Sequence, residues 1–463
     1  MYKISERKKL VDVALGRTAP DVVIKNGKLV NVHTKEIYET DIIISGERIA
    51  AVDDGEYELD DECIVIDANG QYVTPGFIDP HVHLESTAVT ISEFTKEVVP
   101  RGVTSFVEDP HEIVNVLGKR AIDLFYDEVQ NLPINMFLRV PGRVPAMVDE
   151  LETSGARITI EETKELLERP EAVCLAGDIN PGLILSKNDE QLEKISYAVE
   201  LRKTVSGQSP GLKGKELNAF ISAGPEDSHV SEDTEEVLDI VRHGMRALVT
   251  HRPSLFGVED YPEFAAAINE KKIDTRLISF CTDDIEPHIL LNKGHLELRL
   301  QNAIKNGLDP VVAIQMATIN TANFLRITRD YGSVSPGKYA DILILDNLEA
   351  VQVDKVIYHG QLVAEKGELI GELPEFVYPA WAKDTINTHE NISPEDFQIE
   401  VDDGETVKAQ VLIPGEPKRS VIKELDIIDG IVEHNQERGI LSIAVIDRHE
   451  ARGRVGEGFI ADI

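Results

Sequence analysis

Two histidines and a glutamate stand at every second position directly after an apolar run near residue 80. The stretch is VTPGFIDPHVHLES, residues 73–86, in which His81, His83 and Glu85 follow a run that ends at Ile78. Residues i and i+2 of a strand point to the same side, so the three side chains project together if the strand extends that far. Two imidazoles on one side suit a divalent transition-metal ion. The spacing therefore predicts a metal site at the end of a buried strand.

Asp283, near the end of the predicted barrel region, supplies a carboxylate as a further candidate ligand. Asp283 follows the apolar run LISFCT, and a carboxylate in that position can both ligate a metal and exchange a proton with water. Asp284 beside it could instead cap a helix or form a local hydrogen bond. His229 ends another predicted strand and is a further candidate ligand. An H-x-H pattern alone also occurs in solvated loops, so the metal site depends on these distant residues meeting.

Eight apolar segments between residues 73 and 284 alternate with connecting segments, several of which have apolar residues at helical spacing. This alternation predicts an α/β fold, a (β/α)8 TIM barrel, in which the carboxyl ends of all strands share one mouth. A doubly wound open sheet is the competing fold, but it would need a glycine-rich phosphate turn after an early strand. The predicted strands are TPGFIDPHVH, GVTSFVEDP, NMFLRVPG, AVCLAGDIN, TVSGQSPG, AFISAGPEDSH, RALVTHRPS and RLISFCTDD.

Each predicted strand ends in polar or ionisable residues, which the barrel would bring to one mouth. Asp178 is a candidate metal ligand if the backbone turns it inward, and His251 could face substrate or lie in a loop. The complete set is His81, His83, Asp109, Arg139, Asp178, Gln208, His229, His251 and Asp283.

The two flanks of the barrel region have a different pattern. Residues 1–72 contain a short helix and then alternating strands with Asn-Gly hairpin signals. Residues 331–378 return to this pattern after the barrel region, 73–330, so we expect both flanks to form one small β-sandwich domain. Residues 379–463 are predicted to form an additional C-terminal α/β region.

Composition excludes several classes of protein. The 463 residues include 83 acidic and 47 basic side chains, a net charge of −36, without the basic stripe that binds nucleic acid. Three widely spaced cysteines, Cys63, Cys174 and Cys281, favour a reducing cytosol. The first segment lacks the apolar core of a signal peptide, and no apolar run approaches the roughly 20 residues of a membrane span. We therefore expect a soluble cytoplasmic protein with a small-molecule partner.

Several blocks of the sequence resemble the adenine deaminase family of the amidohydrolase superfamily. The stretch PGFIDPHVHLES, with its HVHxES form, is similar to the first-strand block of that family. The resemblance covers nearly the whole chain. Further similar blocks are EDPHEIVNVLG, LETSGA, SGQSPGLKGKELNAFISAG, FCTDD, AIQMATIN, WAKDTIN and LSIAVIDRHEARGRVGEGF.

The resemblance implies hydrolytic deamination of adenine to hypoxanthine and ammonia, with a metal-bound hydroxide attacking the amino-bearing purine carbon. It implies a divalent ion, manganese or iron first and zinc as a further option. His81 and His83 match the first-strand ligands, His229 the sixth-strand ligand and Asp283 the last-strand aspartate, which would accept the proton of water. Family members continue past the end of this chain, so the C-terminal region is expected to be incomplete. Homo-oligomer formation is left open.

The remaining candidate residues have less defined roles. Glu85 is expected with Asp283 and His229 among the catalytic groups, and Glu85, His111 or Glu112 could hydrogen-bond ring nitrogens of the purine. The resemblance places Asp109, His111 and Glu112 near the mouth without assigning individual roles. The residues expected to bind substrate are Asp109, His111, Glu112, Asp284 and Gln208.

Two positions depart from the family pattern. Gly177 stands where the family has a glutamate that bridges two ions, with Asp178 one place on, and Gln208 stands where it has a fifth-strand histidine. A neutral amide oxygen is a poorer ligand for a transition metal than an imidazole. The sequence therefore predicts one firmly bound ion, held by the first-strand histidines and Asp283, and a second ion that is weak or absent.

These departures leave two other functions open. The first is an amidohydrolase that acts on another heterocyclic amine or cyclic amide, with Gln208 contacting substrate instead of metal. The second is a weakly active or non-catalytic homologue that binds a purine. Metal content and steady-state assays on adenine distinguish these functions from adenine deamination.

Overall fold

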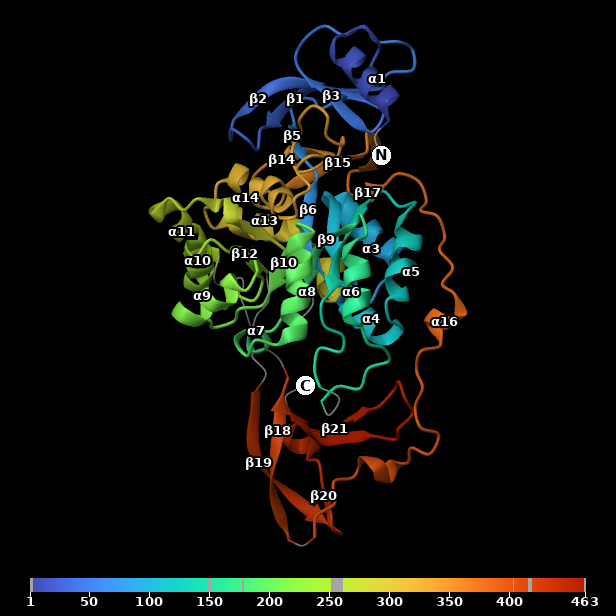
Figure 1. The fold of residues 1–463 in the computed structure, drawn as a ribbon, viewed down its shortest axis with the longest axis vertical. Coiled ribbons are helices and arrows are strands. Elements are labelled where there is room, and N and C mark those ends of the chain that lie inside the picture. Colours follow the sequence, from blue (N-terminus) through green and yellow to red (C-terminus); the bar gives the residue numbers. More distant parts are fainter. Residues whose placement is uncertain are drawn as a thin grey trace. The chain divides into compact units, whose positions relative to one another are not determined.

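The computed structural model describes residues 3–148, 151–176, 179–250, 261–402, 404–414 and 419–461. Within this part of the chain, eight parallel strands form a barrel surrounded by helices (Figure 1). The (β/α)8 barrel predicted from the sequence is confirmed. In order around the barrel, the strands are β6 (Phe77–Val82), β7 (Val103–Glu108), β8 (Asn135–Pro141), β9 (Ala172–Ala176), β10 (Thr204–Gly207), β11 (Asp227–Ser228), β12 (Arg246–Val249) and β13 (Ile278–Phe280).

The barrel closes between its first and last strands, beside two of the predicted metal ligands. Val82 of β6 and Asp283, which follows β13, form a parallel bridge. The N–H of Asp283 donates to the carbonyl of His81 at 2.8 Å. Closure of the barrel therefore makes neighbours of His81 and Asp283, which are far apart in the sequence.

Helices on the outside of the barrel follow the strands in turn. In α10, Val237, Leu238 and Ile240 are buried, and Asp233 caps the first turn by accepting the Glu236 N–H at 2.8 Å. Outer helices are α3 (Ile91–Val98), α5 (Arg120–Val129), α6 (Ile160–Leu167), α8 (Asp189–Glu200), α9 (Gly214–Ser222), α10 (Thr234–Arg242), α11 (Tyr261–Lys271), α13 (Leu296–Lys305), α14 (Pro310–Met316) and α15 (Ile319–Phe324). Shorter helices are α2 (Leu84–Thr87), α4 (His111–Leu117), α7 (Pro181–Leu185) and α12 (Pro287–Asn292).

The first barrel strands are buried on both faces, and their polar residues are buried together with the apolar ones. Every residue of β6 and β7 is buried. Apolar side chains such as Ile78, Val107 and Leu248 pack together in one core cluster. A glycine is required at position 76, directly before β6, because a Cβ there would collide with the side chain of Thr104.

The sixth strand is shorter than the sequence predicts. The segment AFISAGPEDSH is predicted as one strand, but its first residues complete α9, and only Asp227 and Ser228 form β11. The reason is that Leu217 and Phe220, three residues apart, bury one face of a helix. His229 still follows the strand directly, so this difference does not move the candidate ligand.

Segments from both flanks of the barrel region share one sheet, so the first strands and the late strands lie side by side in Figure 1. Its order is β17-β16-β15-β14-β5-β1-β2-β3, with β4 paired to β1. Helix α1 (Ile4–Ala14) packs on it through Val13. The strands are β1 (Val22–Val30), β2 (Ile37–Ser45), β3 (Arg48–Val52), β4 (Ile64–Asp67), β5 (Tyr72–Pro75), β14 (Ile342–Asn347), β15 (Gln352–Tyr358), β16 (Gln361–Glu365) and β17 (Glu368–Leu369).

A second compact unit comprises residues 115–118, 144–157 and 377–463, of which the described part contains a five-stranded sheet. Its core includes Val411, Leu425 and Phe459. In the described part of residues 377–463, helix is confined to α16 (Ala380–Lys383) and short 3-10 turns, so strands dominate where the sequence predicts an α/β region. The order is β20 (Ile431–Val432), β19 (Arg419–Ile428), β18 (Thr406–Ile413), β22 (Val455–Ala461) and β21 (Ile440–Ile446).

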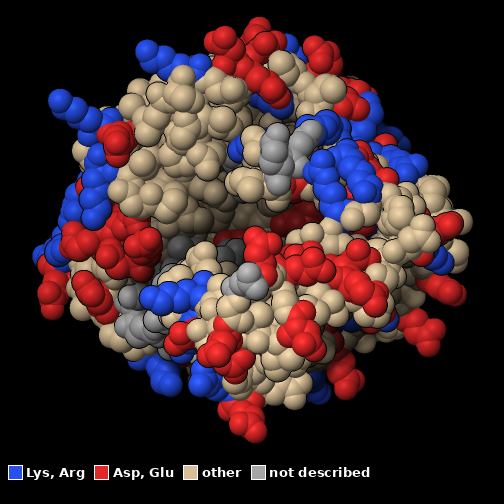
Figure 2. All heavy atoms as spheres, turned by 90° about the horizontal axis from the view of Figure 1, so that it is seen from below, with Lys and Arg blue, Asp and Glu red and all other residues tan. Residues whose placement is uncertain are grey.

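Charged side chains of both signs share the surface. On the face shown in Figure 2, Lys and Arg side chains lie in short groups among Asp and Glu side chains. Among the described residues, we find no helix with the length and apolar character that a membrane span needs. The three cysteines are free, and Cys174 and Cys281 are buried.

Buried Asp341, beside β14, gives the protein a pH-dependent stability. Burial raises the pKa of Asp341 to about 7, although its carboxylate accepts the His359 N–H at 2.9 Å and Asn135 Nδ2 at 3.0 Å. The folded state therefore binds this proton more tightly than the unfolded chain, whose pKa is 3.8. The contribution to the free energy of unfolding is largest below the unfolded pKa and is lost as pH rises through about 7.

Substitution of Asp341 by asparagine should remove this dependence. Between about pH 5 and about pH 8, we expect the free energy of unfolding of the wild type to fall by about 3 kcal/mol more than that of D341N, since roughly two pH units separate pH 5 from the folded pKa. The hydrogen bond to Asn135 that D341N loses should cost the same at both pH values. Denaturant unfolding of both proteins measures the difference, and parallel pH profiles would contradict the assignment.

Candidate metal centre

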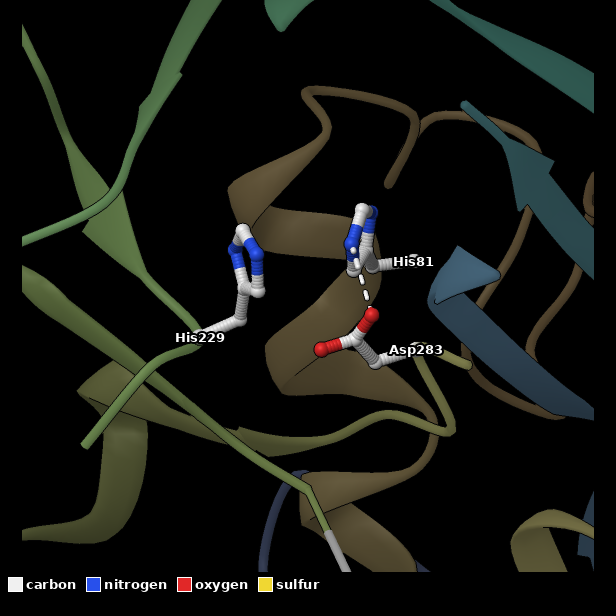
Figure 3. Close-up of side chains that lie close together, drawn as sticks. All are labelled: His81, His229 and Asp283. Atoms are coloured by element: carbon white, nitrogen blue, oxygen red, sulfur yellow. Dashed lines mark ion pairs between the residues drawn. The ribbon is translucent and has the colours of Figure 1, made fainter. Parts of the chain in front are cut away.

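His81, His229 and Asp283 come together at the mouth of the barrel from three different strand ends (Figure 3). His81 belongs to β6, His229 follows β11 and Asp283 follows β13. One potential ligand atom from each residue lies within 4.8 Å of the other two. The side chains are buried, with 1%, 7% and 2% of their residues' surface exposed, respectively. The geometry thus gathers three of the predicted ligands in one cluster.

The histidine nitrogens of this cluster lack hydrogen-bond partners among the described residues. Both ring nitrogens of His81 and Nδ1 of His229 are buried and unpaired. His81 Nε2 lies 3.6 Å from Asp283 Oδ1, the pair marked by the dashed line in Figure 3, and this separation is too long for a hydrogen bond. Because buried polar atoms without partners are costly, these nitrogens fit a site completed by a metal ion.

The electrostatic environment favours the protonation states that bind metal. Burial, reinforced by Arg139, holds the pKa of His81 well below its usual value, and burial lowers the pKa of His229 to about 4. Burial opposes ionisation of Asp283, but the neighbouring histidines outweigh it and hold the pKa of this carboxyl well below its usual value. Neutral imidazoles and an ionised carboxylate are the forms that coordinate a cation.

His83 is oriented by a hydrogen bond on the other side of its ring. Its Nδ1 lies 3.0 Å from the carbonyl oxygen of Asp109, and a carbonyl can only accept, so Nδ1 carries a proton. Its Nε2 lies 3.5 Å from Asp283 Oδ1. Metal-ligating histidines are typically held in this way, with one nitrogen donating and the other facing the ion. Burial opposes protonation of His83, but Glu112, Asp109 and Asp283 outweigh it and raise the pKa of His83 to about 10. His83 is therefore a fourth candidate ligand that must release a proton when it binds a metal ion.

A charged group formed by Asp109, His111 and Glu112 lies next to His83. His111 Nδ1 is 3.3 Å from Asp109 Oδ1, His111 Nε2 is 3.0 Å from Glu112 Oε1, and His83 Nδ1 is 3.3 Å from Glu112 Oε2. Burial opposes charge on these groups, but the ion pairs outweigh it, raise the pKa of His111 to about 12 and lower that of Glu112 to about 2. This group therefore combines charges of both signs beside the candidate ligands.

Glu85 does not project with the two histidines. Strand β6 ends at Val82, and Glu85 lies on the short helix α2, where its Oε1 accepts the N–H of Ile113 at 2.8 Å. The strand is too short for the alternation that would place three side chains on one side. Glu85 instead holds the helix α4 that carries His111.

The remaining predicted site residues have varied positions. Gln208 lines a small pocket together with Asp109, His111 and the cluster histidines. The N–H of Asp284 donates to Asp283 Oδ1 at 2.8 Å, and Asp284 forms a second ligand-spaced group with His83 and Asp283. Gly177, Asp178 and His251 lie outside the described residues, so their roles stay predictions.

Asp79 joins the first and last strands beneath the cluster, a role that sequence reasoning missed. Its Oδ1 accepts the N–H groups of His81 at 3.1 Å and Thr282 at 3.3 Å, and its Oδ2 accepts the Thr282 hydroxyl at 2.6 Å. These bonds fix the backbone of His81 against that of Thr282, directly before Asp283. The available signal was a charged residue inside an apolar run, two positions before His81.

The barrel and its histidine–aspartate cluster define a metal-dependent hydrolase of the amidohydrolase type. Residues 72–363 match the amidohydrolase family model, and this family generally uses a divalent metal. Dihydropyrimidinase from Brevibacillus agri has a similar fold, with a TM-score of 0.58 and 15% identity over 76% of this chain and 96% of that chain. A β-aspartyl dipeptidase from Fervidobacterium islandicum has a TM-score of 0.55 and 17% identity over 76% of this chain and 98% of that chain.

Relatives that align with nearly the whole chain identify the family more specifically. Adenine deaminase 3 of Rhizobium meliloti is 36% identical over 460 residues, which are 98% of this chain and 76% of that protein. Adenine deaminase of Ruegeria sp. is 37% identical over 98% of this chain and 75% of that protein, and adenine deaminase of Clostridium botulinum is 36% identical over 98% and 76%. The chain belongs to the adenine deaminase family, as the sequence blocks predict.

Proposed function

We propose that this protein hydrolyses adenine to hypoxanthine and ammonia at the cluster of His81, His229 and Asp283. The observation that carries this proposal is the identity of 36% and 37% to adenine deaminases over 98% of the chain. The cluster supports it because two neutral imidazoles and a carboxylate stand together at the mouth of an amidohydrolase barrel.

The donor set suits one divalent ion, for which we propose Mn²⁺ or Fe²⁺, with Zn²⁺ as a further option. His81, His229 and Asp283 would hold it, with His83 as the fourth ligand, and the unpaired nitrogens of His81 support this fit. When bound, the ion lowers the pKa of water and stabilises negative charge that develops on the substrate.

Asp283 is the proposed proton carrier. Its carboxylate is ionised and lies 3.5 Å and 3.6 Å from imidazole nitrogens of His83 and His81, so it faces the centre of the site. It accepts a proton from the attacking water and delivers it to the leaving amino group. The oxygen of water remains on the purine carbon as the hypoxanthine carbonyl, its second proton ends on the adjacent ring nitrogen, and the amino group departs as ammonia.

Asp109, His111 and Glu112 are the proposed contacts to the purine ring. Adenine presents both hydrogen-bond donors and acceptors, and this group offers carboxylates and an imidazole within 3.3 Å of one another. Gln208 on the cavity wall and Asp284 beside Asp283 are the further proposed contacts. Glu85 supports these residues through α4.

The proposed compartment is the cytoplasm. Three free cysteines, two of them buried as thiols, support a reducing environment. A small purine base present there is the expected partner.

Steady-state turnover of adenine by protein purified without chelator and supplied with Mn²⁺ tests the proposed function. We expect hypoxanthine and ammonia to form in equal amounts. A panel of other heterocyclic amines and cyclic amides serves as the comparison. A protein that binds metal and converts members of that panel, but not adenine, would contradict adenine deamination.

A further inference from the structure

A fully buried cation lies in the wall of the same mouth. Arg139 belongs to β8, and its side chain has no exposed surface. A guanidinium remains protonated throughout the physiological range, so Arg139 places a permanent positive charge inside the barrel. Burial of such a charge is unfavourable unless other groups pair with it.

The guanidinium is paired with four strand ends. Its Nη1 donates to the carbonyl oxygen of Pro80 at 2.9 Å, and its Nη2 donates to the hydroxyl of Ser206. Nε lies 3.4 Å from Asp109 Oδ2, and Nη2 lies 3.9 Å from Asp227 Oδ2. Arg139 therefore reaches residues of β6, β10 and β11 and the residue that follows β7.

Arg139 and the candidate metal ligands share one cavity. Arg139, His81 and His229 all line it, and Pro80, which accepts a hydrogen bond from Arg139, directly precedes His81. The guanidinium is thus fixed beside the metal ligands by the same strand that carries one of them. A second divalent cation in this cavity would meet a permanent positive charge at short range and low dielectric.

Three buried aspartates of the mouth, Asp283, Asp109 and Asp227, divide between the two cations. Asp283 stands with the cluster histidines and balances a metal ion there. Asp109 and Asp227, which could balance a further ion, are buried and lie within 3.9 Å of the guanidinium. Gln208 on the same wall carries no charge. The fixed cation therefore neutralises carboxylates beside the cluster that a second ion could otherwise use.

We propose that Arg139 takes the place of a second metal ion, so that the site binds one divalent cation per chain. This inference rests on the proposed metal-dependent function. Arg139 is a positioning residue, because it acts through Asp109, Asp227 and the backbone before His81. The positive charge of Arg139 also helps to stabilise the negative charge that develops on the substrate during the reaction.

The first measurement uses the full chain without substitution. Metal-free protein is titrated with Mn²⁺ and, separately, with Zn²⁺, and bound metal is counted by elemental analysis after free metal is removed. We expect saturation at one ion per chain. Saturation at two ions per chain overturns the inference.

Two variants at position 139 separate charge from packing. R139M keeps a long stem but removes the positive charge beside Asp109 and Asp227, so a second binding event should appear in the titration. R139K keeps the charge and should stay at one ion. A folded R139M that still binds one ion with unchanged affinity overturns the inference, as does R139K that binds two. If R139M fails to fold, the numbers of ions bound by the wild type and by R139K test the inference.

The metal count and the assay of adenine turnover test the role of Arg139 and the proposed function separately. Protein that binds one ion but does not convert adenine would defeat the proposed function and leave the role of Arg139 standing. Protein that binds two ions and converts adenine would defeat the role of Arg139 and leave deamination standing.

Discussion

Replacement of Asp283 by asparagine should lower kcat/KM for adenine by on the order of 10³-fold or more, because the carboxylate serves both proton transfer and cation binding. Asp283 has a φ of 56°, a left-handed conformation that asparagine adopts as readily as aspartate. The substitution therefore removes the charge while it preserves the backbone and the bond that closes the barrel. Alanine at this position would add backbone strain, so the effect of losing the carboxylate could not be separated from the effect of the strain.

Steady-state kinetics and metal content measure the effect of D283N together. The metal affinity should fall as well, since a buried carboxylate is lost beside His81 and His83. D123N is the matched control, because the Asp123 side chain is 64% exposed on the outside of the barrel. If the activity of D283N lay within a few-fold of that of the control, Asp283 would not take part in the reaction.

The arrangement of the barrel was predictable because it depends on local patterns repeated along the chain. Short segments rich in apolar residues form the buried strands, as in β6 and β7, and several of the segments between them have apolar residues at helical spacing. Parallel strands bring all their carboxyl ends to one mouth, which is why His81, His229 and Asp283 could be assigned to one site. The pairing of β14 with β5 is less visible, because no local pattern specifies which distant strand is the neighbour.

Directions of individual side chains were not predictable. Glu85 was expected to project with His81, but one turn of helix after Val82 sends it to the backbone of Ile113. The alternation rule depends on where the strand ends, and an error of two residues reverses the conclusion. The grouping of His229 with His81 and Asp283 likewise follows from three-dimensional distances.

The pairings between buried polar residues were the features that could least be predicted from the sequence. Arg139 was recognised as a polar strand end, and Asp79 only as the residue after an apolar run, but neither sequence position indicates a partner. Asp79 meets Thr282, and Arg139 meets Asp227, only once the barrel is closed. Such pairs make the ligand geometry specific, because each ties together strands from different parts of the chain.

Removal of divalent metal should abolish adenine turnover and also lower the stability of the folded protein. An ion that binds the native cluster stabilises it by about 2.7 kcal/mol at a free concentration about 100 times its Kd. Thermal unfolding with chelator and with excess Mn²⁺ measures this difference, and activity should return on addition of Mn²⁺. Identical unfolding curves in the two conditions would contradict a metal ion held by the folded barrel.

Comparison of two histidine variants tests whether the cluster is the source of this stabilisation. H81A removes a buried ring whose nitrogens form no hydrogen bond among the described residues, so its cost should be much larger with metal than in chelator. H288A is the matched control, because the His288 side chain is 62% exposed and pairs with Glu286 on the same barrel. Its unfolding should respond to metal as the wild type does. If H81A kept the full metal response, the ion would be bound elsewhere, and the buried nitrogens at the mouth would need another explanation.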